Sequence, residues 1–350
     1  MKRSFVGIMV AVGAAALFAV AAGQARADDI SGAGATFPYP VYAKWAEAYK
    51  QQTGVGLNYQ SIGSGGGIKQ IEASTVTFGA SDMPLMPQVL QQNGLVQWPM
   101  IVGGAIPVVN IPGIRPGQML LDGPTIASIY LGDITRWNDP AIKRLNPALD
   151  LPALDIAPVY RADGSGTNFL FTNFLSKVSP TFAQKVGSNT SVQWPVGIGA
   201  KGNEGVANQV VQTTGAIGYV EYAYVIQTHM IYAKLRNRAG QYVAPSAQAF
   251  QAAAANADWS RAPGFYEVLT DQPGAASWPI TGASFILMHT HSGDKNTTAA
   301  LKFFNWAYMH GQQLAAQLDY VPIPADVAKL VEARWQKALM VDGRPVWPAK

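Results

Sequence analysis

Three loops of one design constrain what this chain can fold into. Each follows a short apolar segment, combines glycine with Ser or Thr, and leads into a segment of helical character: residues 34–37 (GATF), 63–66 (GSGG) and 164–167 (GSGT). A strand, a tight turn and a helix in succession are the repeating unit of α/β proteins. Singly, each loop is most simply a turn. Three in one chain favour an α/β fold and suggest a shared binding role.

The loops have the chemistry of an anion site. The N-terminus of a helix offers free backbone N–H groups and the positive end of the helix dipole. Small residues let an anion approach the backbone, and hydroxyls add neutral donors. The loops match neither nucleotide fingerprint: Lys69 is followed by Gln70 rather than Ser or Thr, and Phe37 and Ile68 occupy the last glycine position of G-x-G-x-x-G.

Strand-like and helix-like segments alternate along most of the chain. Val41, Trp45 and Tyr49 recur four residues apart, which predicts an amphipathic helix ending near residues 53–54. Residues 101–111 are long and apolar, as in a strand buried on both faces. We expect a short strand and loop over residues 30–36 and further strands at residues 56–62, 77–80, 156–160 and 216–220. Further helices are expected at residues 125–130, 168–175, 301–309 and 327–339. This order predicts α/β layers with largely parallel sheets.

The first 27 residues are expected to be a cleaved secretory signal peptide. Lys2 and Arg3 precede an apolar run over residues 5–22, and residues 25–27 (ARA) match a cleavage site. An N-terminal membrane anchor is the alternative. The chain has no cysteine, which excludes disulfides, thiolate-bound metals, thiol catalysis and a lipoprotein anchor.

Composition narrows the remaining classes. Hydrophobic residues make up 49% of the chain and charged residues 13%, which excludes a disordered chain. The 350 residues suggest roughly two domains. Without Lys2, Arg3 and Arg26 the formal net charge falls from +4 to +1 and no basic cluster is visible, so we expect no nucleic-acid partner.

Two charged residues beside the loops are candidate ligands. Arg161 offers an oxyanion a planar fork of donors, although pairing with Asp163 is the simpler interpretation. Asp82 follows the apolar segment 78–81, and a helix cap or turn is its simpler role. A carboxylate near an anion is favourable only if the anion carries a proton.

In this order the loops resemble the periplasmic phosphate-binding proteins of ABC-type phosphate uptake systems. The similar segments are residues 30–45 (ISGAGATFPYPVYAKW), 59–71 (YQSIGSGGGIKQI), 78–85 (FGASDMPL) and 161–169 (RADGSGTNF), and residues 121–138, 215–224, 278–281 and 301–308 continue them. The resemblance spans essentially the whole chain after residue 27. It implies an α/β, two-domain periplasmic binding protein (type 2) fold with a hinged interdomain ligand cleft. Residues 28–105 with 278–350 would form one domain and residues 106–277 the other.

The resemblance also implies a site. Asp82 would accept the phosphate proton, and Arg161, steadied by Asp163, would donate charge-assisted hydrogen bonds. One departure is Gly65, where a second Ser is expected after Ser64. The implied phosphate-binding residues are Ala35, Thr36, Phe37, Ser64, Asp82, Arg161, Asp163, Ser165, Gly166 and Thr167.

The implied function is a periplasmic solute-binding protein, not an enzyme, that captures inorganic phosphate. It would deliver phosphate to the membrane permease subunits of an ABC importer, coupled to its ATPase, and act as a monomer without metal or cofactor. One alternative is a secreted phosphatase-like relative that hydrolyses phosphomonoesters, but the sequence shows no metal-ligating cluster, and neither Ser64 nor Ser165 lies in a G-x-S-x-G motif. Another is a sulfate or molybdate carrier; Asp82 argues against it, because those anions carry no proton at neutral pH.

Overall fold

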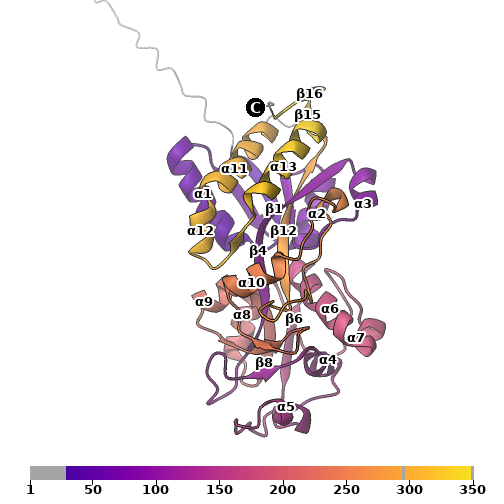
Figure 1. Cartoon of the computed structure of the whole chain (residues 1–350), viewed down its shortest axis with the longest axis vertical. Helices are drawn as coiled ribbons and strands as arrows, with labels where there is room; N and C mark the ends of the chain where they lie inside the picture. Colours follow the sequence, from indigo (N-terminus) through magenta and orange to yellow (C-terminus); the bar gives the residue numbers. More distant parts are fainter. Residues whose placement is uncertain (1–28, 294–295, 348–350) are drawn as a thin grey trace, which may run out of the picture.

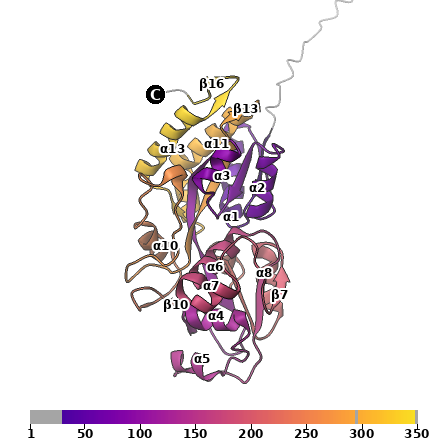
Figure 2. The ribbon, with the colours of Figure 1, turned by 90° about the vertical axis from the view of Figure 1, so that its right-hand side faces the viewer.

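A computed structural model describes residues 29–293 and 296–347. The predicted signal peptide, residues 1–27, lies outside the described residues. The described chain forms two lobes joined at a narrow waist (Figure 1). The first and last segments of the described chain belong to one lobe, and its middle forms the other (Figure 2). Among the described residues, no helix has the length and apolar character needed to cross a membrane.

The first lobe, which holds the chain ends, packs helices around one part of the sheet. Its strands are β1 (Ile30–Gly34), β2 (Leu57–Ser61), β3 (Phe78–Ser81), β12 (Thr281–His289), β14 (Val321–Pro322) and the small β13 (His291–Ser292), β15 (Met340–Val341) and β16 (Arg344–Pro345). Its helices are α1 (Tyr39–Thr53), α2 (Ser64–Glu72), α3 (Pro87–Gln92), α11 (Thr297–His310), α12 (Gln312–Ala316) and α13 (Ala325–Ala338).

The second lobe is built in the same way from the middle of the chain. Its strands are β5 (Leu120–Leu121), β6 (Ala157–Arg161), β7 (Ile198–Ala200), β8 (Ala216–Glu221), β9 (Ile231–Tyr232), β10 (Lys234–Arg236) and β11 (Tyr242–Val243). Its helices are α4 (Gly123–Leu131), α5 (Pro140–Leu145), α6 (Gly166–Val178), α7 (Pro180–Lys185), α8 (Gly202–Gln212) and α9 (Tyr222–Gln227). Helix α10 (Ala247–Ala254) and the short 3-10 helix Pro263–Phe265 lie on the return path to β12.

One strand, β4 (Leu95–Val109), runs through both lobes. Its first part pairs with β12 as far as Gly104 opposite Thr281, and its last part pairs with β8 from Ala105 opposite Glu221 onward. All fifteen residues of β4 are buried, which confirms a strand buried on both faces, although it runs from Leu95 to Val109 rather than over residues 101–111. The change of partner between Gly104 and Ala105 lies at the waist.

The sheet is mixed rather than largely parallel. In the order β2-β1-β3-β12-β4-β8-β6-β7, the outer pairs are parallel, whereas β12 runs antiparallel to β3 and β4, and β8 runs antiparallel to β4. The expectation of largely parallel sheets is therefore wrong at the centre. The reason is topological: β4 leaves the first lobe and β12 returns to it, so these neighbours point in opposite directions.

Local signals explain the main helices. Helix α1 begins after Pro38, with a second proline in its first turn, and ends at Gly54 in the left-handed conformation (φ 77°). Trp45 on its buried face donates from Nε1 to the carbonyl oxygen of Gly311 at 2.8 Å, which ties α1 to the end of α11. The helices expected at residues 125–130, 168–175 and 301–309 are confirmed within α4, α6 and α11, and the one expected at residues 327–339 is α13, which ends at Ala338.

Candidate anion-binding site

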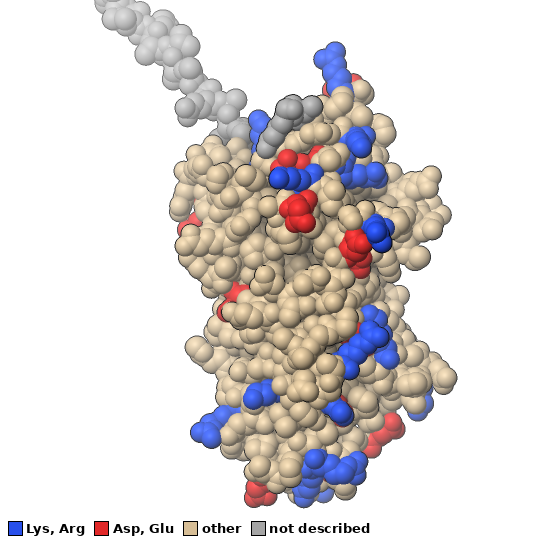
Figure 3. Space-filling model, viewed as in Figure 1, with Lys and Arg blue, Asp and Glu red and all other residues tan. Residues whose placement is uncertain are grey.

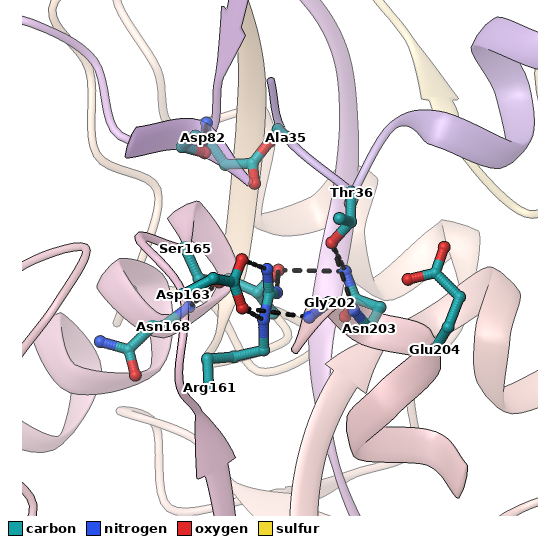
Figure 4. A network of polar contacts seen from close by, with 12 residues as sticks. Ala35, Thr36, Asp82, Arg161, Asp163, Ser165, Asn168, Gly202, Asn203 and Glu204 are labelled. Atoms are coloured by element: carbon teal, nitrogen blue, oxygen red, sulfur yellow. Dashed lines mark hydrogen bonds and ion pairs between the residues drawn. The ribbon is translucent and has the colours of Figure 1, made fainter. Parts of the chain in front are cut away.

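The three loops meet at the waist. Residues 34–37 and 63–66 end strands β1 and β2 and lead into α1 and α2 of the first lobe, and residues 164–167 link β6 to α6 of the second. The lobes touch here, because the Gly65 N–H donates to the Gly164 carbonyl oxygen at 2.8 Å. Figure 4 shows residues of both lobes facing one another across this junction. Tertiary structure thus brings the three loops together as the sequence predicts.

Several backbone donors at the junction are unused. They belong to the first turns of α2 and α6 and to the turn before α1, where intrahelical partners are lacking. Five such N–H groups make no hydrogen bond to any described residue: Thr36, Phe37, Ser64, Gly166 and Thr167. Unpaired buried N–H groups are unfavourable, so their gathering in one place points to a ligand that accepts hydrogen bonds.

Ala35 and Thr36 are held by contacts on the sides away from these donors. Ala35 is buried, and its N–H donates to the Ala80 carbonyl oxygen at 3.0 Å. The Thr36 hydroxyl oxygen accepts from Asn203 Nδ2 at 2.6 Å (Figure 4). The Thr36 carbonyl oxygen accepts from the Tyr224 hydroxyl at 2.7 Å. These contacts fix the turn while its N–H groups stay free.

Arg161 forms a fork with Asp163. Its Nε and Nη2 donate to the two Asp163 carboxylate oxygens at 2.8 and 2.5 Å, and its Nη1 lies 3.4 Å from the Thr167 hydroxyl oxygen (Figure 4). Burial raises the pKa of Asp163, but the Arg161 guanidinium and the Gly202 N–H together hold that pKa below its usual value. The simpler interpretation of the sequence, pairing of Arg161 with its neighbour, is confirmed. The pair is electrically neutral, and it leaves Nη1 turned toward Thr167 rather than toward a carboxylate.

Unlike Asp163, which is paired with Arg161, Asp82 has no partner for its carboxylate. Its side chain is buried, and its carboxylate accepts no hydrogen bond from any described residue. Burial raises the pKa of Asp82 to about 7, although the nearby Ser284 hydroxyl, the Arg161 charge and the Ser64 hydroxyl each lower it. A helix-capping role is wrong, since Met86, not Asp82, lies at the cap position of α3 and the carboxylate accepts no backbone N–H. An unpartnered buried carboxyl is a functional candidate because its desolvation is not offset within the protein.

Ser64 and Ser165 each use the hydroxyl oxygen as an acceptor. Ser64 Oγ accepts from the Asp82 N–H at 3.1 Å, and Ser165 Oγ caps α6 by accepting from the Asn168 N–H at 3.0 Å. The two hydroxyl protons are therefore left to donate. A Cβ on Gly166 would lie 2.5 Å from Ser64 Oγ and closer still to Asp82 Oδ2, so only glycine fits at this position.

Gly65 replaces the expected second Ser for a visible reason. A Cβ on Gly65 would lie 3.1 Å from the Gly164 Cα, and a Cβ on Gly164 would lie 3.0 Å from the Gly65 Cα. The two glycines thus permit the closest approach of the two lobes. A serine at residue 65 would require one loop to shift by a few tenths of an ångström.

Sequence reasoning missed Asn203. Its Nδ2 donates to the Thr36 hydroxyl and lies 3.4 Å from the Thr167 hydroxyl, so one amide bridges the lobes. Asn203 follows Gly202, which has φ 74° and opens α8 directly after β7. The run AKGN at residues 200–203 is a fourth strand, glycine and helix junction, and could have been found by the same pattern.

The junction can bind a small oxyanion. It offers backbone and hydroxyl donors, one guanidinium and one carboxyl that needs a proton donor. Among residues 29–293 and 296–347, no group of three or more His, Asp or Glu could hold a metal ion. The Nε2 atom of His289 contacts the Ile71 carbonyl oxygen at 2.6 Å.

Comparison with known proteins shows the family to which this chain belongs. Residues 19–309 match the model of the PBP superfamily domain. The chain is 51% identical to the phosphate-binding protein PstS of Pasteurella multocida over 95% of this chain and 97% of that protein. It is 52% identical to the phosphate-binding protein PstS of Haemophilus influenzae over 90% of this chain and 95% of that one.

Solved structures agree on the fold. A high-affinity periplasmic phosphate-binding protein (PfluDING) bound with phosphate superposes with a TM-score of 0.69 at 20% identity, covering 88% of this chain and 94% of that chain. A putative phosphate ABC transporter substrate-binding protein with bound phosphate from Clostridium perfringens gives a TM-score of 0.61 at 20% identity, covering 85% of this chain and 100% of that chain. At this identity the likeness concerns the fold alone.

Proposed function

Since this chain belongs to the PBP superfamily and, within it, to the PstS phosphate-binding proteins, we propose that it binds inorganic phosphate among the loops at its waist. It is a phosphate-binding protein of the PstS family, and we propose that it serves an ABC importer in the periplasm. The observation that carries the proposed site is the gathering of unused N–H donors around a guanidinium and an unpartnered carboxyl.

The proposed ligands come from the residues that the sequence predicts, and Asn203 holds Thr36 in place beside them. The N–H groups of Thr36, Phe37, Ser64, Gly166 and Thr167 donate to phosphate oxygens, as do the Ser64 and Ser165 hydroxyls. Arg161 Nη1 donates a charge-assisted hydrogen bond, each such bond contributing about 1.5–3 kcal/mol. A handful of these bonds offsets dehydration and leaves roughly −8 kcal/mol, which corresponds to micromolar affinity.

Asp82 selects for a protonated anion. Inorganic phosphate near neutral pH still carries a proton, because it is a triprotic acid whose last proton leaves only in strongly alkaline solution. Monohydrogen phosphate can therefore donate to the Asp82 carboxylate, which otherwise has no donor. Sulfate has no proton to give, and it would place a like charge against a buried carboxylate.

The remaining parts of the function follow the family. We propose that the protein is exported by residues 1–27, works as a monomer in the periplasm, catalyses no reaction, and passes phosphate to permease subunits coupled to an ATPase.

No continuous basic patch covers the face drawn in Figure 3, where charges of both signs are scattered.

The domain division is also a proposal. Residues 28–105 with 278–350 and residues 106–277 would move as two bodies, with β4 as one connection between them. The change of partner from β12 to β8 between Gly104 and Ala105 supports this boundary.

A calorimetric titration tests the proposed function. Phosphate should bind the purified chain without residues 1–27 at a stoichiometry of one, and sulfate at the same concentrations should give no heat of binding. Equal binding of both anions would overturn phosphate selectivity, and no phosphate binding would overturn the site.

A further inference from the structure

A second buried carboxyl, Glu221, lies at the waist outside the proposed ligand set. It is the last residue of β8 and pairs with Ala105, where β4 changes partner. Its side chain is fully buried, Oε1 has no hydrogen-bond partner among the described residues, and Oε2 accepts from the Ala223 N–H at 2.8 Å. No Lys, Arg or His of the described chain forms an ion pair with it.

Glu221 is joined to the phosphate-facing turn by Tyr320. The Tyr320 hydroxyl oxygen lies 2.8 Å from Glu221 Oε2 and 2.6 Å from the Phe37 carbonyl oxygen. Tyr320 directly precedes β14 of the first lobe, whereas Glu221 ends β8 of the second. The three groups therefore form one chain of contacts from the waist to the turn before α1.

The number of protons available to these two contacts determines whether Glu221 is protonated. A carbonyl oxygen can only accept, and a phenol carries one proton. If Tyr320 donates to Phe37, the contact with Glu221 lacks a proton unless Glu221 supplies it. If Tyr320 donates to Glu221 instead, the Tyr320 hydroxyl oxygen and the Phe37 carbonyl oxygen lie 2.6 Å apart with no proton between them. Only a protonated Glu221 satisfies both contacts.

The groups around Glu221 also favour its protonated form. Burial raises the pKa of Glu221 well above its usual value, although the contact with Tyr320 and the backbone N–H groups of Ala223 and Tyr222 lower it. The negative charge of Asp82 raises it further. The other ionisable groups that interact with Glu221 are Tyr222, Tyr224 and Tyr320, and none of them is a cation.

We infer that Glu221 is a positioning residue for the anion site: as a neutral acid it donates to Tyr320, which donates to the Phe37 carbonyl oxygen and holds the Thr36–Phe37 turn with its N–H groups toward the anion. This role rests on the proposed phosphate site for its effect on affinity. The protonation of Glu221 itself does not depend on phosphate.

The backbone N–H of Glu221 also helps to hold the Thr36–Phe37 turn. Its N–H donates to Asn203 Oδ1 at 2.9 Å, and the amide nitrogen of Asn203 donates to the Thr36 hydroxyl. Glu221 thus holds Thr36 through Asn203 and Phe37 through Tyr320. Both carbonyl groups of the turn are occupied by tyrosine hydroxyls, Thr36 by Tyr224 and Phe37 by Tyr320.

The first test is infrared spectroscopy without phosphate. At about pH 8.5, far above the ordinary Glu pKa of about 4.3, the folded protein should show the C=O stretch of a protonated carboxylic acid. Comparing Asp82→Asn with Asp82→Asn/Glu221→Gln removes any signal from Asp82. The band should disappear with Glu221→Gln, and in Tyr320→Phe it should persist but shift to higher frequency. If Glu221→Gln instead removes the bands of an ionised carboxylate, the inference is overturned.

The second test is phosphate titration of the relay variants. Tyr320→Phe removes one hydroxyl, and Glu221→Gln puts at Oε2 either an amide nitrogen, which cannot accept from Ala223, or an oxygen, which cannot donate to Tyr320. Each should weaken phosphate binding about 10-fold, and the double variant should weaken it no more than about 2-fold beyond the weaker-binding single variant, because both break one relay.

Two exposed positions serve as matched controls. Tyr266→Phe and Glu47→Gln remove the same groups from the surface and should leave affinity unchanged. Circular dichroism must show that all variants are folded. Additive losses from Tyr320→Phe and Glu221→Gln, or wild-type affinity in both, would overturn the positioning role. If the wild type fails to bind phosphate while the infrared band is present, the proposed function fails and the protonated relay remains.

Discussion

Gly166 lies directly against Asp82, although the two residues belong to opposite lobes. The contact leaves no room for a Cβ on Gly166, which would also lie 2.5 Å from Ser64 Oγ. Any side chain at residue 166 therefore opposes the closed arrangement without disturbing either lobe alone.

Gly166→Ala should accordingly weaken phosphate binding at least about 100-fold by calorimetry, because the methyl group keeps the lobes apart where the ligand must be enclosed. The thermal midpoint without phosphate should change by only a few degrees. Gly205→Ala is the matched control, since a Cβ there would meet its nearest atom at 3.6 Å. Wild-type affinity in Gly166→Ala would contradict the closed geometry of the site.

Phosphate should also compact the protein. The proposed ligands come from both lobes, so the bound anion links them and favours closure. Small-angle scattering should give a smaller radius of gyration in saturating phosphate than in a sample stripped of phosphate, with sulfate as the control. An unchanged radius, with the stripped sample shown to be open, would argue against a closing cleft.

Arg161→Ala should weaken phosphate binding by at least one to two decades. It removes the guanidinium from a dianion and also leaves Asp163 without its partner, and losing one member of a buried charge pair costs about 2–5 kcal/mol. Arg161→Lys should recover only part of the loss, because a lysine cannot reproduce the fork onto Asp163. Unchanged affinity in Arg161→Ala, measured by calorimetry, would remove Arg161 from the site.

Asp82→Asn should narrow the preference for phosphate over sulfate mainly by admitting sulfate. The amide can donate to an anion that has no proton, whereas the carboxylate repels it. Competition titrations of both anions at neutral pH, on wild type and variant, measure the change. If the variant rejects sulfate as strongly as the wild type, the size of the anion-binding site rather than Asp82 determines the preference for phosphate.

The free energy of unfolding should carry a pH dependence from Asp82. Without phosphate its pKa is raised from 3.8 to about 7 in the folded protein. The folded state then holds a proton that the unfolded chain has released, so stability falls as the pH rises from about 4 to about 7, by about 1.4 kcal/mol for each pH unit in that range. Asp82→Asn should match wild type near pH 4 and be more stable near pH 8 in denaturant titrations. Parallel pH profiles for the two proteins would show that Asp82 is ionised at no cost.

Local patterns were enough to predict the main elements and most of the candidate site. Glycine with a hydroxyl residue between an apolar segment and a helix is a short-range signal, and Ser64, Ser165 and Thr167 lie where it indicates. Asn203 was missed because its role depends on contact with Thr36, which lies 167 positions away in the chain. The direction of β12 against β4 was missed because strand polarity depends on the path of the chain between the lobes.

The sequence by itself determined that three strand-to-helix junctions end in free N–H groups, since glycine and hydroxyl residues at helix starts leave those donors open. It also determined that the arginine lies next to an aspartate. Only the tertiary structure decided which donors share one site, that Asp82 is buried without a partner, and that Glu221 is joined to Phe37 through Tyr320. The reason is that desolvation and proton sharing depend on groups from distant segments, which meet only when both lobes pack against β4.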